Sequence, residues 1–476
     1  MDWIKDNKGA GAWAFTKQPN KWGYLNNPRW MTTQSEPVNY DGRESEEPQI
    51  WDPSNVPFSK VGADEHIPCG HWHKVPIGGW PEGGGGEEGE NRVFFGGRIL
   101  KDDGKGSSMW RSWRIQGCEI SNGDIDWEIN EYVNAYNKCV WKMDCFENEL
   151  YSAGENVWGD EIDQFNAWVI EKRDAETGVL IWSIEHNIGG VVDIAVDSTG
   201  VYPIGGNWSG DTMFYASRME KRSRQDGSLT WQVVTAMTPP AGSTGFYQRS
   251  VDCALDNDYL YVSSIYLYNY LAKQYQGGII YTIDKETGNI VDTWYDTLYN
   301  NPFPSNRPWD IAVSTKSKTG NGSENVYVMT CKYLRQLDNS WNLNFSSEFR
   351  SSTLDYDTID IGISCSDAGI FIGGQQGSNS YQGYKVELYK YSGVNQWSTI
   401  YNENIGSYIG PQFGDLKSLD SDVYIASHLR YHPSTYYYQA YKQKINSNGE
   451  IEWTIPDTTT APDDSHFWAV ATTNWV

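Results

Sequence analysis

The chain has 476 residues, of which 39% are hydrophobic and 14% aromatic, with 47 glycines and a formal net charge of −25. So acidic a surface repels phosphate backbones and argues against a nucleic-acid partner. No apolar run is long enough to span a bilayer, so we expect no membrane insertion. The wealth of aromatic residues and glycine favours short strands and tight turns over helices.

The first residues, MDWIKDNKGAGAW, contain no apolar segment of the kind that a signal peptide needs. We therefore expect a cytoplasmic protein, or a virion component that is assembled inside a host. The cysteines are odd in number, seven, and scattered in spacing, which argues against a disulfide framework. Most of them are expected to be small buried apolar residues.

Residues 1–92 differ from the rest of the chain in composition. They are rich in proline, contain GGGG at 83–86, and include seven tryptophans, Trp3, Trp13, Trp22, Trp30, Trp51, Trp72 and Trp80. Disordered tails are poor in aromatic residues, so this composition argues against a disordered tail. We predict an irregular but ordered N-terminal extension, which packs on the remainder of the chain or docks it into a larger assembly.

A histidine and cysteine cluster lies inside this extension. The segment EHIPCGHWHK at 65–74 holds His66, Cys69, His71 and His73, and these are the usual ligands of Zn²⁺ and related metals. Their spacing matches no standard zinc finger, so two interpretations stay open. One is a site for Zn or another divalent metal, and the other is a metal-free loop in which these side chains pack and form hydrogen bonds.

From residue 93 onward, one pattern recurs seven times. A turn containing glycine or asparagine leads into a short strand with a tryptophan, and a second strand of mixed aromatic and polar residues precedes each turn. The seven tryptophans that end these units are Trp127, Trp182, Trp231, Trp294, Trp341, Trp397 and Trp453. Units of this size, each completed by two further upstream strands, fit the four-stranded blade of a β-propeller.

The innermost strands account for ring closure. VDIAVD at 192–197 and its counterparts precede six of the aromatic runs, whereas the first run, VFFGG at 93–97, has none. The missing strand appears at 466–472 as HFWAVAT. We therefore predict an all-β fold for residues 93–476: a seven-bladed propeller of four-stranded antiparallel blades, closed by the C-terminal strand. Six or eight blades stay open as alternatives, and an immunoglobulin-like array would need longer units.

Two turns carry a resemblance to a known family. DAETGVLIW at 174–182 and DKETGNIVDTW at 284–294 resemble the docking motif of the quinoprotein-type, PQQ-like and WD40-like, propeller repeats. The resemblance implies that Gly178 and Gly288 shape the turns, and that Trp182 and Trp294 pack between neighbouring blades. By this resemblance these four residues are blade-docking residues and not catalytic ones. The other five end tryptophans keep little more than the turn and the tryptophan of the motif, and the repeat predicts that they also pack between neighbouring blades.

Enzymes of that family hold a quinone between a tryptophan and a disulfide of adjacent cysteines, together with Ca²⁺. No two cysteines are adjacent here, so we expect no quinone and assign no catalytic or cofactor-binding residue. The recurring Asp193, Asp252, Asp310 and Asp360 are interpreted as acceptors for backbone N–H groups at turns beside the inner strands. A carboxylate ring that binds a cation in the channel is the alternative.

Two tyrosine-rich stretches, at 266–275 and 430–441, are longer than hairpins need. Exposed aromatic rings cover much area at low entropic cost and suit protein or glycan recognition. The candidate partner-binding residues are Tyr266, Tyr268, Tyr270, Tyr275, Tyr431, Tyr436, Tyr437 and Tyr438. We predict a non-catalytic scaffold or recognition protein, for instance a virion surface or tail component. The alternative is a metal-dependent or quinoprotein-like enzyme with its site in the channel.

Overall fold

The computed structural model of the chain divides into two units, residues 1–84 and 85–476. It describes residues 3–5, 13–15, 91–102, 109–131, 137–158, 165–186, 189–208, 215–238, 241–270, 273–295, 308–314, 325–330, 333–338, 341–348, 361–375, 383–401, 409–430, 438–457 and 464–473. Within the first unit, β1 (Trp3–Lys5) pairs with the antiparallel β2 (Trp13–Phe15).

The second unit consists of seven four-stranded antiparallel sheets, which we number as blades 1 to 7. Blade 1 contains β30 (Asp464–Thr472), β3 (Arg92–Asp102), β4 (Met109–Glu119) and β5 (Ile125–Glu131). Blade 2 contains β6 (Asn137–Phe146), β7 (Glu149–Trp158), β8 (Phe165–Asp174) and β9 (Leu180–His186). A single bridge between Arg111 of β4 and Asn137 of β6 joins these two blades into one sheet.

The other five blades are separate sheets whose strand order follows the chain. Blade 3 contains β10 (Val191–Asp197), β11 (Gly200–Trp208), β12 (Tyr215–Arg222) and β13 (Leu229–Thr235). Blade 4 contains β14 (Thr244–Leu255), β15 (Tyr259–Tyr270), β16 (Lys273–Asp284) and β17 (Ile290–Tyr295). Blade 5 contains β18 (Pro308–Ser314), β19 (Asn325–Thr330), β20 (Tyr333–Leu337) and β21 (Leu343–Glu348).

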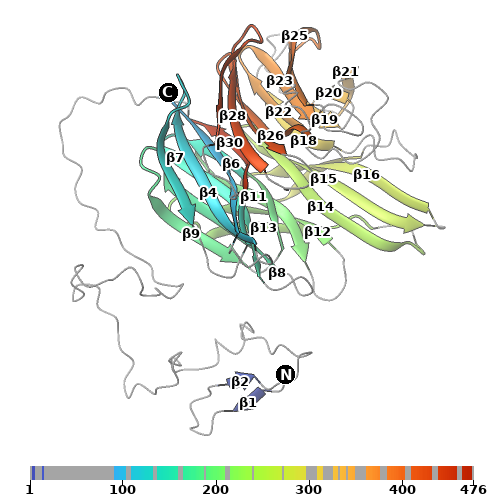
Figure 1. The fold of residues 1–476 in the computed structure, drawn as a ribbon. Helices are drawn as coiled ribbons and strands as arrows, with labels where there is room; N and C mark the ends of the chain where they lie inside the picture. The colour runs from blue at the N-terminus through green and yellow to red at the C-terminus, as the bar shows by residue number, and fades with distance from the viewer. Residues whose placement is uncertain are drawn as a thin grey trace, which may run out of the picture. The chain divides into compact units, whose positions relative to one another are not determined.

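Blades 6 and 7 complete the ring (Figure 1). Blade 6 contains β22 (Ile361–Ser366), β23 (Gly369–Gln375), β24 (Tyr384–Tyr389) and β25 (Asn395–Tyr401). Blade 7 contains β26 (Ile409–Leu419), β27 (Asp422–Arg430), β28 (Tyr438–Ile445) and β29 (Ile451–Pro456). Within the described part of the chain there are strands and turns and no helix. Accordingly, none of the described segments is a helix that could cross a membrane.

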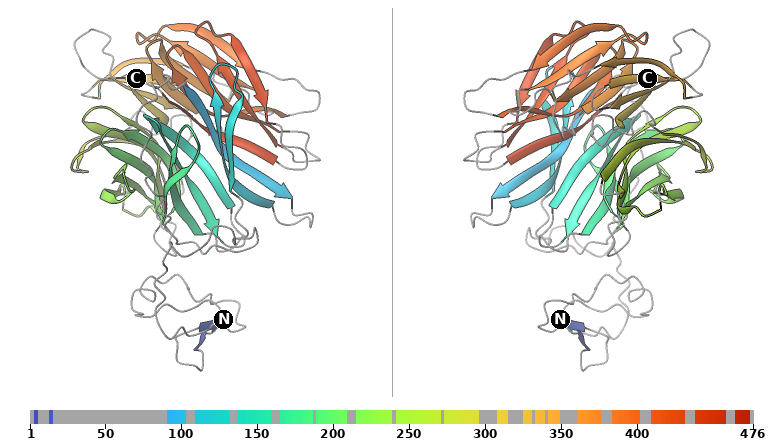
Figure 2. Two further views of the ribbon diagram at one scale, coloured as in Figure 1. Left: turned by 90° about the vertical axis from the view of Figure 1, so that its left-hand side faces the viewer. Right: turned by 90° about the vertical axis from the view of Figure 1, so that its right-hand side faces the viewer.

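The ring closes as the sequence predicts. β30 pairs with β3 from Leu100↔Asp464 to Val93↔Thr472, so the inner strand of blade 1 comes from the other end of the propeller. The innermost strands form an unbroken cycle of neighbours, β30, β6, β10, β14, β18, β22 and β26, and β26 again contacts β30. Figure 2 shows the sheets side by side in two further views. The seven-bladed prediction is confirmed, and closure leaves no open blade at either end of the ring.

The motif turns form for a local reason. In DAETG the carboxylate of Asp174 accepts hydrogen bonds from the backbone N–H groups of Glu176 and Thr177 and from the Thr177 hydroxyl. The N–H of Gly178 then donates to the carbonyl of Asp174 over 2.8 Å, with φ at +71°. Glycine adopts this left-handed conformation without steric cost. The segment from Asp284 to Gly288 forms the same bonds.

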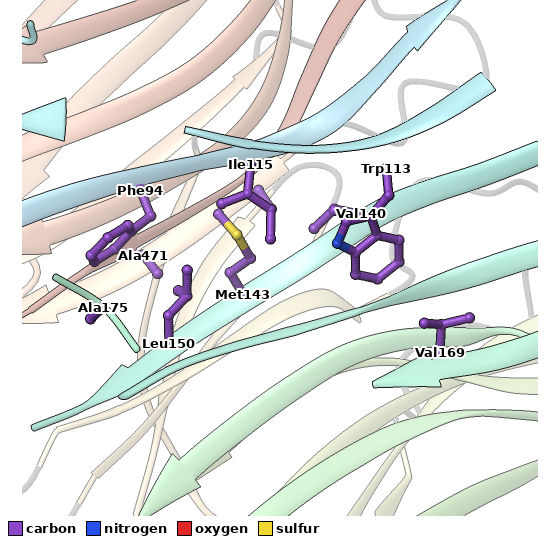
Figure 3. Packing of buried hydrophobic residues seen from close by; sticks show 10 residues of the cluster. Phe94, Trp113, Ile115, Val140, Met143, Leu150, Val169, Ala175 and Ala471 are labelled. Carbon is purple, nitrogen blue, oxygen red and sulfur yellow. The ribbon is translucent and has the colours of Figure 1, made fainter. Parts of the chain in front are cut away.

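The hydrophobic core lies between the blades, because each sheet has apolar side chains on both faces. Figure 3 shows the cluster between blades 1 and 2, where Phe94 and Trp113 of blade 1 meet Val140, Met143 and Leu150 of blade 2. These side chains are essentially inaccessible to solvent. A blade that lost its neighbour would expose such a face, so the blades stabilise one another in sequence around the ring.

Candidate functional site: the ring channel and the tyrosine arm

Five of the predicted docking tryptophans fasten neighbouring blades. The indole Nε1 of each donates to a backbone carbonyl in the third-to-fourth-strand turn of the next blade, over 2.8 to 3.4 Å. The pairs are Trp127 with Ala175, Trp182 with Arg224, Trp231 with Lys285, Trp397 with Ser447, and Trp453 with Ile120. The turn glycines lie against these rings: a Cβ on Gly178 would stand 2.8 Å from Trp127.

In two of these junctions a lysine donates a further hydrogen bond to the same carbonyl, which the sequence analysis did not predict. The carbonyl of Arg224 accepts from both Trp182 Nε1 and Lys172 Nζ, and the carbonyl of Lys285 accepts from both Trp231 Nε1 and Lys221 Nζ. Each lysine stands directly opposite its tryptophan in the strand register. The recurrent ten-residue spacing from lysine to tryptophan was the available signal.

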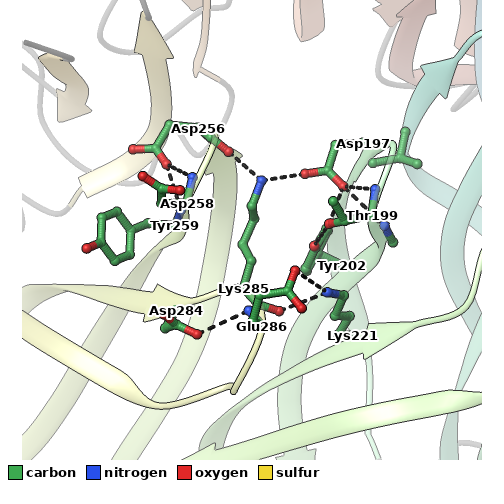
Figure 4. Close-up of polar contacts among 12 residues, drawn as sticks. Asp197, Thr199, Tyr202, Lys221, Asp256, Asp258, Tyr259, Asp284, Lys285 and Glu286 are labelled. Atoms are coloured by element: carbon green, nitrogen blue, oxygen red, sulfur yellow. Dashed lines mark hydrogen bonds and ion pairs between the residues drawn. The ribbon is translucent and has the colours of Figure 1, made fainter.

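Lys285 itself extends the junction between blades 3 and 4 (Figure 4). Its buried ammonium group lies 2.6 Å from the carboxylate of Asp197 in blade 3 and 2.6 Å from the carbonyl of Asp256 in its own blade. Lys221 reaches back from blade 3 to the turn that contains Lys285. A buried ammonium group needs such partners, because leaving it without them costs several kcal/mol.

Trp294 and Trp341 do not stand at the register position of the other five tryptophans, although both pack against the hydrophobic cluster between blades 4 and 5. In blade 4 the residue at that register position is Asp292, opposite Thr282, and Trp294 lies two residues further along β17. Trp341 lies in the turn before β21, at a φ of +61°, where other blades have glycine. Its Nε1 donates to Asp292 of the preceding blade over 2.9 Å, and its ring stacks on Trp294.

The ring encloses a channel cavity of about 290 Å³, and each lining residue that the structure describes belongs to an inner strand. β-Bulges in these strands, for example before Lys142, Asp193, Asp252 and Asp415, precede the charged lining residues. A bulge re-aims the side chain that follows it. The local irregularity of the inner strands therefore directs polar groups into the channel.

Two ion pairs cross the channel side of blade 1. Lys142 Nζ of β6 lies 2.8 Å from Asp415 Oδ1 of β26, and Lys417 Nζ of β26 lies 3.0 Å from Asp144 Oδ1 of β6. The sequence Lys-Met-Asp on one strand thus faces Asp-Leu-Lys on the other. The intervening strand, β30, contributes alanines at 469 and 471. We call this pair of ion pairs the charge clasp.

The second oxygen of each clasp carboxylate binds the backbone of the adjacent inner strand. Asp144 accepts from the N–H of Val196 over 3.0 Å, and Asp415 accepts from the N–H of Val470 over 3.2 Å. Within the clasp, the charge of Asp144 raises the pKa of Lys417. Both carboxylates are therefore engaged in holding blades together.

The recurring aspartates need a correction. Asp193 accepts a hydrogen bond from the N–H of Cys253 on the inner strand of the next blade, over 2.6 Å, and not from a turn. Burial raises the pKa of Asp193, and this effect outweighs the Lys142 charge and the hydrogen bonds of Asp193 with Asp252 and the Cys253 N–H, all of which lower the pKa. Asp252 lies 3.9 Å from Lys142 Nζ. The side chain of Asp310 and the whole of Asp360 fall outside what the structure describes.

An aromatic and basic cluster lies around the middle of the inner strands β6 and β30. The half-buried Trp141 and Trp468 lie 5.1 Å apart between ring centroids, and the Arg98 guanidinium covers the Trp468 ring at 4.5 Å. His428 meets Trp468 edge-on, and burial together with the Arg98 charge lowers the pKa of His428 to about 3. This imidazole is consequently neutral at physiological pH.

No group of three or more His, Cys, Asp or Glu side chains suited to a metal occurs among the residues that the structure describes. The predicted metal ligands His66, Cys69, His71 and His73 lie outside those residues. Zn or another divalent metal at that cluster stays a prediction. Of the cysteines within the described ranges, Cys118, Cys139, Cys145, Cys253 and Cys365 form no disulfide with one another.

Four of the predicted tyrosines come together in blade 4. β15 and β16 continue their pairing out to Tyr270↔Lys273, and Tyr268 stands opposite Tyr275 in the register. The rings of Tyr266 and Tyr268 are parallel to within 12° at a centroid distance of 6.1 Å. We call residues 264–270 and 273–278 the tyrosine arm. β14, β15 and β16 are visible at the right of Figure 1.

Of the second predicted tyrosine group, the structure describes Tyr438. Tyr431, Tyr436 and Tyr437 lie outside the described residues, and Tyr438 begins β28, opposite Arg430. Each group lies where the second strand of a blade is followed by the third, at the ends of β15 and β16 for the first group and between β27 and β28 for the second. Since β15 and β27 are second strands, these connections emerge on the same face of the ring, the face at which the inner strands begin.

The fold and its fastenings define a seven-bladed β-propeller, with the number of blades that the repeat count predicted. No protein-family profile and no curated protein matches the chain. Among solved structures it is similar to BamB from Moraxella catarrhalis, with 14% identity, 73% of this chain and 89% of that one covered, and a TM-score of 0.34. A protein from Lactobacillus plantarum shows 12% identity, 81% and 99% coverage and a TM-score of 0.44.

The quinohemoprotein alcohol dehydrogenase from Comamonas testosteroni is similar at 10% identity, with 74% of this chain and 66% of that one covered and a TM-score of 0.43. Likeness at this level concerns the fold alone, since one fold hosts many unrelated functions. The assignment of blades rests on the strand pairing of the chain itself.

Proposed function

We propose that the protein is a non-catalytic recognition scaffold, which presents the tyrosine arm of blade 4 to a protein partner. The observation that carries the proposal is the parallel stack of Tyr266 and Tyr268 on a hairpin whose register also brings in Tyr270 and Tyr275. Tyrosine supplies a large amphipathic surface with few rotatable bonds, which is why it is enriched in binding sites.

The channel supports the same proposal. Lys142, Asp144, Asp415 and Lys417 are bonded to one another and to the backbone of adjacent inner strands. Their side chains thus fasten blades, and a rigid closed ring is a suitable base for a projecting binding surface. A component of a virion surface or tail is the assembly in which we place the protein, with residues 1–92 as a second docking element.

The test is partner capture by the tagged full-length chain in the cells or particles that contain it, followed by measurement of affinity for the captured protein. Combined Tyr266→Ala and Tyr268→Ala should weaken binding by about 30-fold or more, which is about 2 kcal/mol and typical of an aromatic hot spot. Tyr295→Ala is the matched control, because Tyr295 is an exposed tyrosine on the outer strand of the same blade. Equal affinity of the double variant and the control would refute the proposal, and co-sedimentation with a particle would test the virion context.

An enzyme with its site in the channel is the second candidate. The observation in its favour is the buried pair Asp193 and Asp252 beside a cavity of about 290 Å³. Elemental analysis of the purified chain tests it. Stoichiometric Ca or Zn that disappears in Asp252→Asn would favour the channel site, whereas metal that disappears in His71→Ala would assign it to the histidine and cysteine cluster.

A further inference from the structure

The tyrosine arm has an edge that no described strand covers. β16 pairs with β15 along its full length, from Tyr270↔Lys273 to Tyr259↔Asp284. On its other side β17 pairs only with the segment from Ile279 to Ile283. Residues 273–278 therefore present backbone N–H and C=O groups that lack a strand partner among the described residues. Such an edge is a template for a further strand.

Two consecutive residues of this edge are glycines and have no side chain. Gly277 and Gly278 follow each other in β16, and Gly277 stands opposite Tyr266. A Cβ on Gly277 would lie 2.3 Å from the Tyr266 hydroxyl oxygen, so the ring lies across the space that a side chain would fill. Glycine inside a strand weakens it and often marks a place where another backbone approaches closely.

The charge of the arm differs from that of the chain. Residues 264–278, SIYLYNYLAKQYQGG, include one charged side chain, Lys273, within a chain of net charge −25. An uncharged strand with apolar side chains can approach this edge without desolvating a carboxylate. A second copy of the chain is disfavoured as the occupant, since two such acidic molecules repel each other.

We propose that residues 273–278 bind an extended, uncharged segment of a partner protein by strand addition, with an apolar side chain of that segment packed on the Tyr266 and Tyr268 rings. This inference rests on the proposed recognition function and specifies how the partner is held. In strand addition the main-chain hydrogen bonds supply affinity, and alternate side chains supply specificity.

The probe is a linear heptapeptide selected from a phage-displayed library on the full-length protein. The selected peptide is resynthesised in two forms, each N-methylated at every second amide but in opposite registers. Only alternate N–H groups of an added strand face the edge, so one form should bind at least about 30-fold more weakly and the other about as well as the parent, because it retains every edge-facing bond. This comparison uses the unaltered protein and does not depend on how a variant folds.

Gly277→Val provides the second arm of the experiment. The branched side chain displaces the Tyr266 ring and should weaken peptide binding at least about tenfold, whereas Tyr295→Ala should leave it unchanged. Strand addition would be overturned if the parent peptide binds and N-methylation weakens both forms equally or weakens neither. Recognition by Tyr266 and Tyr268 would survive that result. A dimer of the chain itself that Gly277→Val abolishes would overturn the choice of another protein as the occupant. If the Tyr266 and Tyr268 variant also captures its partner normally, the proposed function fails as well.

Discussion

The junctions on either side of blade 4 are built differently. Toward blade 3, Trp231 and Lys221 converge on the carbonyl of Lys285, and Gly288 lies against the indole. Toward blade 5, the direction of bonding is reversed: Trp341 in the turn of blade 5 donates back to Asp292 of blade 4. The propeller thus accommodates two kinds of junction between equivalent strands, provided that an aromatic side chain fills the space between the turns.

The reversal has two causes in the sequence. ETGNIVDTW carries two more residues between glycine and tryptophan than ETGVLIW, and these place Asp292 where other blades have tryptophan. The turn of blade 5, DNSWN, has no glycine, so Trp341 takes the left-handed position. A left-handed conformation costs a non-glycine residue about 1–2 kcal/mol, and the stack on Trp294 together with the hydrogen bond to Asp292 offsets that cost.

The largest difference between the two kinds of junction should appear on removal of a tryptophan. Trp182, 5% exposed, docks blade 2 on blade 3, so Trp182→Ala should lower the free energy of unfolding by about 3–5 kcal/mol. Trp294→Ala removes a half-buried ring outside the docking position and should cost about 1 kcal/mol. Denaturant titration of both variants measures the contrast, and equal losses would show that the two tryptophans are equivalent after all.

Substitution of the left-handed turn residue should give a smaller effect, and one that differs between the two junctions. Gly288→Ala places a Cβ at a φ of +73° and 2.8 Å from Trp231, and should cost about 1–2 kcal/mol. Trp341→Gly relieves the same strain but loses a stack and a hydrogen bond, so its net change should stay within about 1 kcal/mol. Thermal unfolding of the two variants is the measurement. A large loss in Trp341→Gly would mean that the reversed junction is stronger than we infer.

The inner end of the junction between blades 3 and 4 should respond to pH. Because burial raises the pKa of Asp193, its ionised form is less favourable in the folded protein than in the unfolded chain. The stability that this group contributes is therefore present at low pH and is lost as the pH rises through the raised pKa. Asp193→Asn should match the wild type below about pH 4 and become the more stable of the two as the pH increases. Unfolding midpoints from pH 4 to pH 8 test this, and a gap that shrinks with rising pH would contradict it.

Repetition made the ring predictable from sequence, because the turn, the aromatic run and the inner strand recur together and HFWAVAT supplies the strand that blade 1 lacks. Spacing alone did not distinguish the docking position from its neighbours at Trp294 and Trp341, since strand register depends on pairing. The charge clasp had no local signal, because Lys142 and Asp415 are 273 residues apart. The tyrosines at 266–275 were found by composition, whereas their convergence follows from the β15–β16 register.

The pairing of β30 with β3 also has a consequence for how the chain is made. The strands β3, β4 and β5 are synthesised first, yet the inner strand that completes their blade comes after every other strand of the ring. Domains generally fold as units during synthesis, and unpaired strand edges make incomplete folding intermediates prone to aggregation. The inner edge of β3 thus lacks its partner strand until β30 has been made, and the channel lining and the core between blades 7 and 1 are incomplete until then.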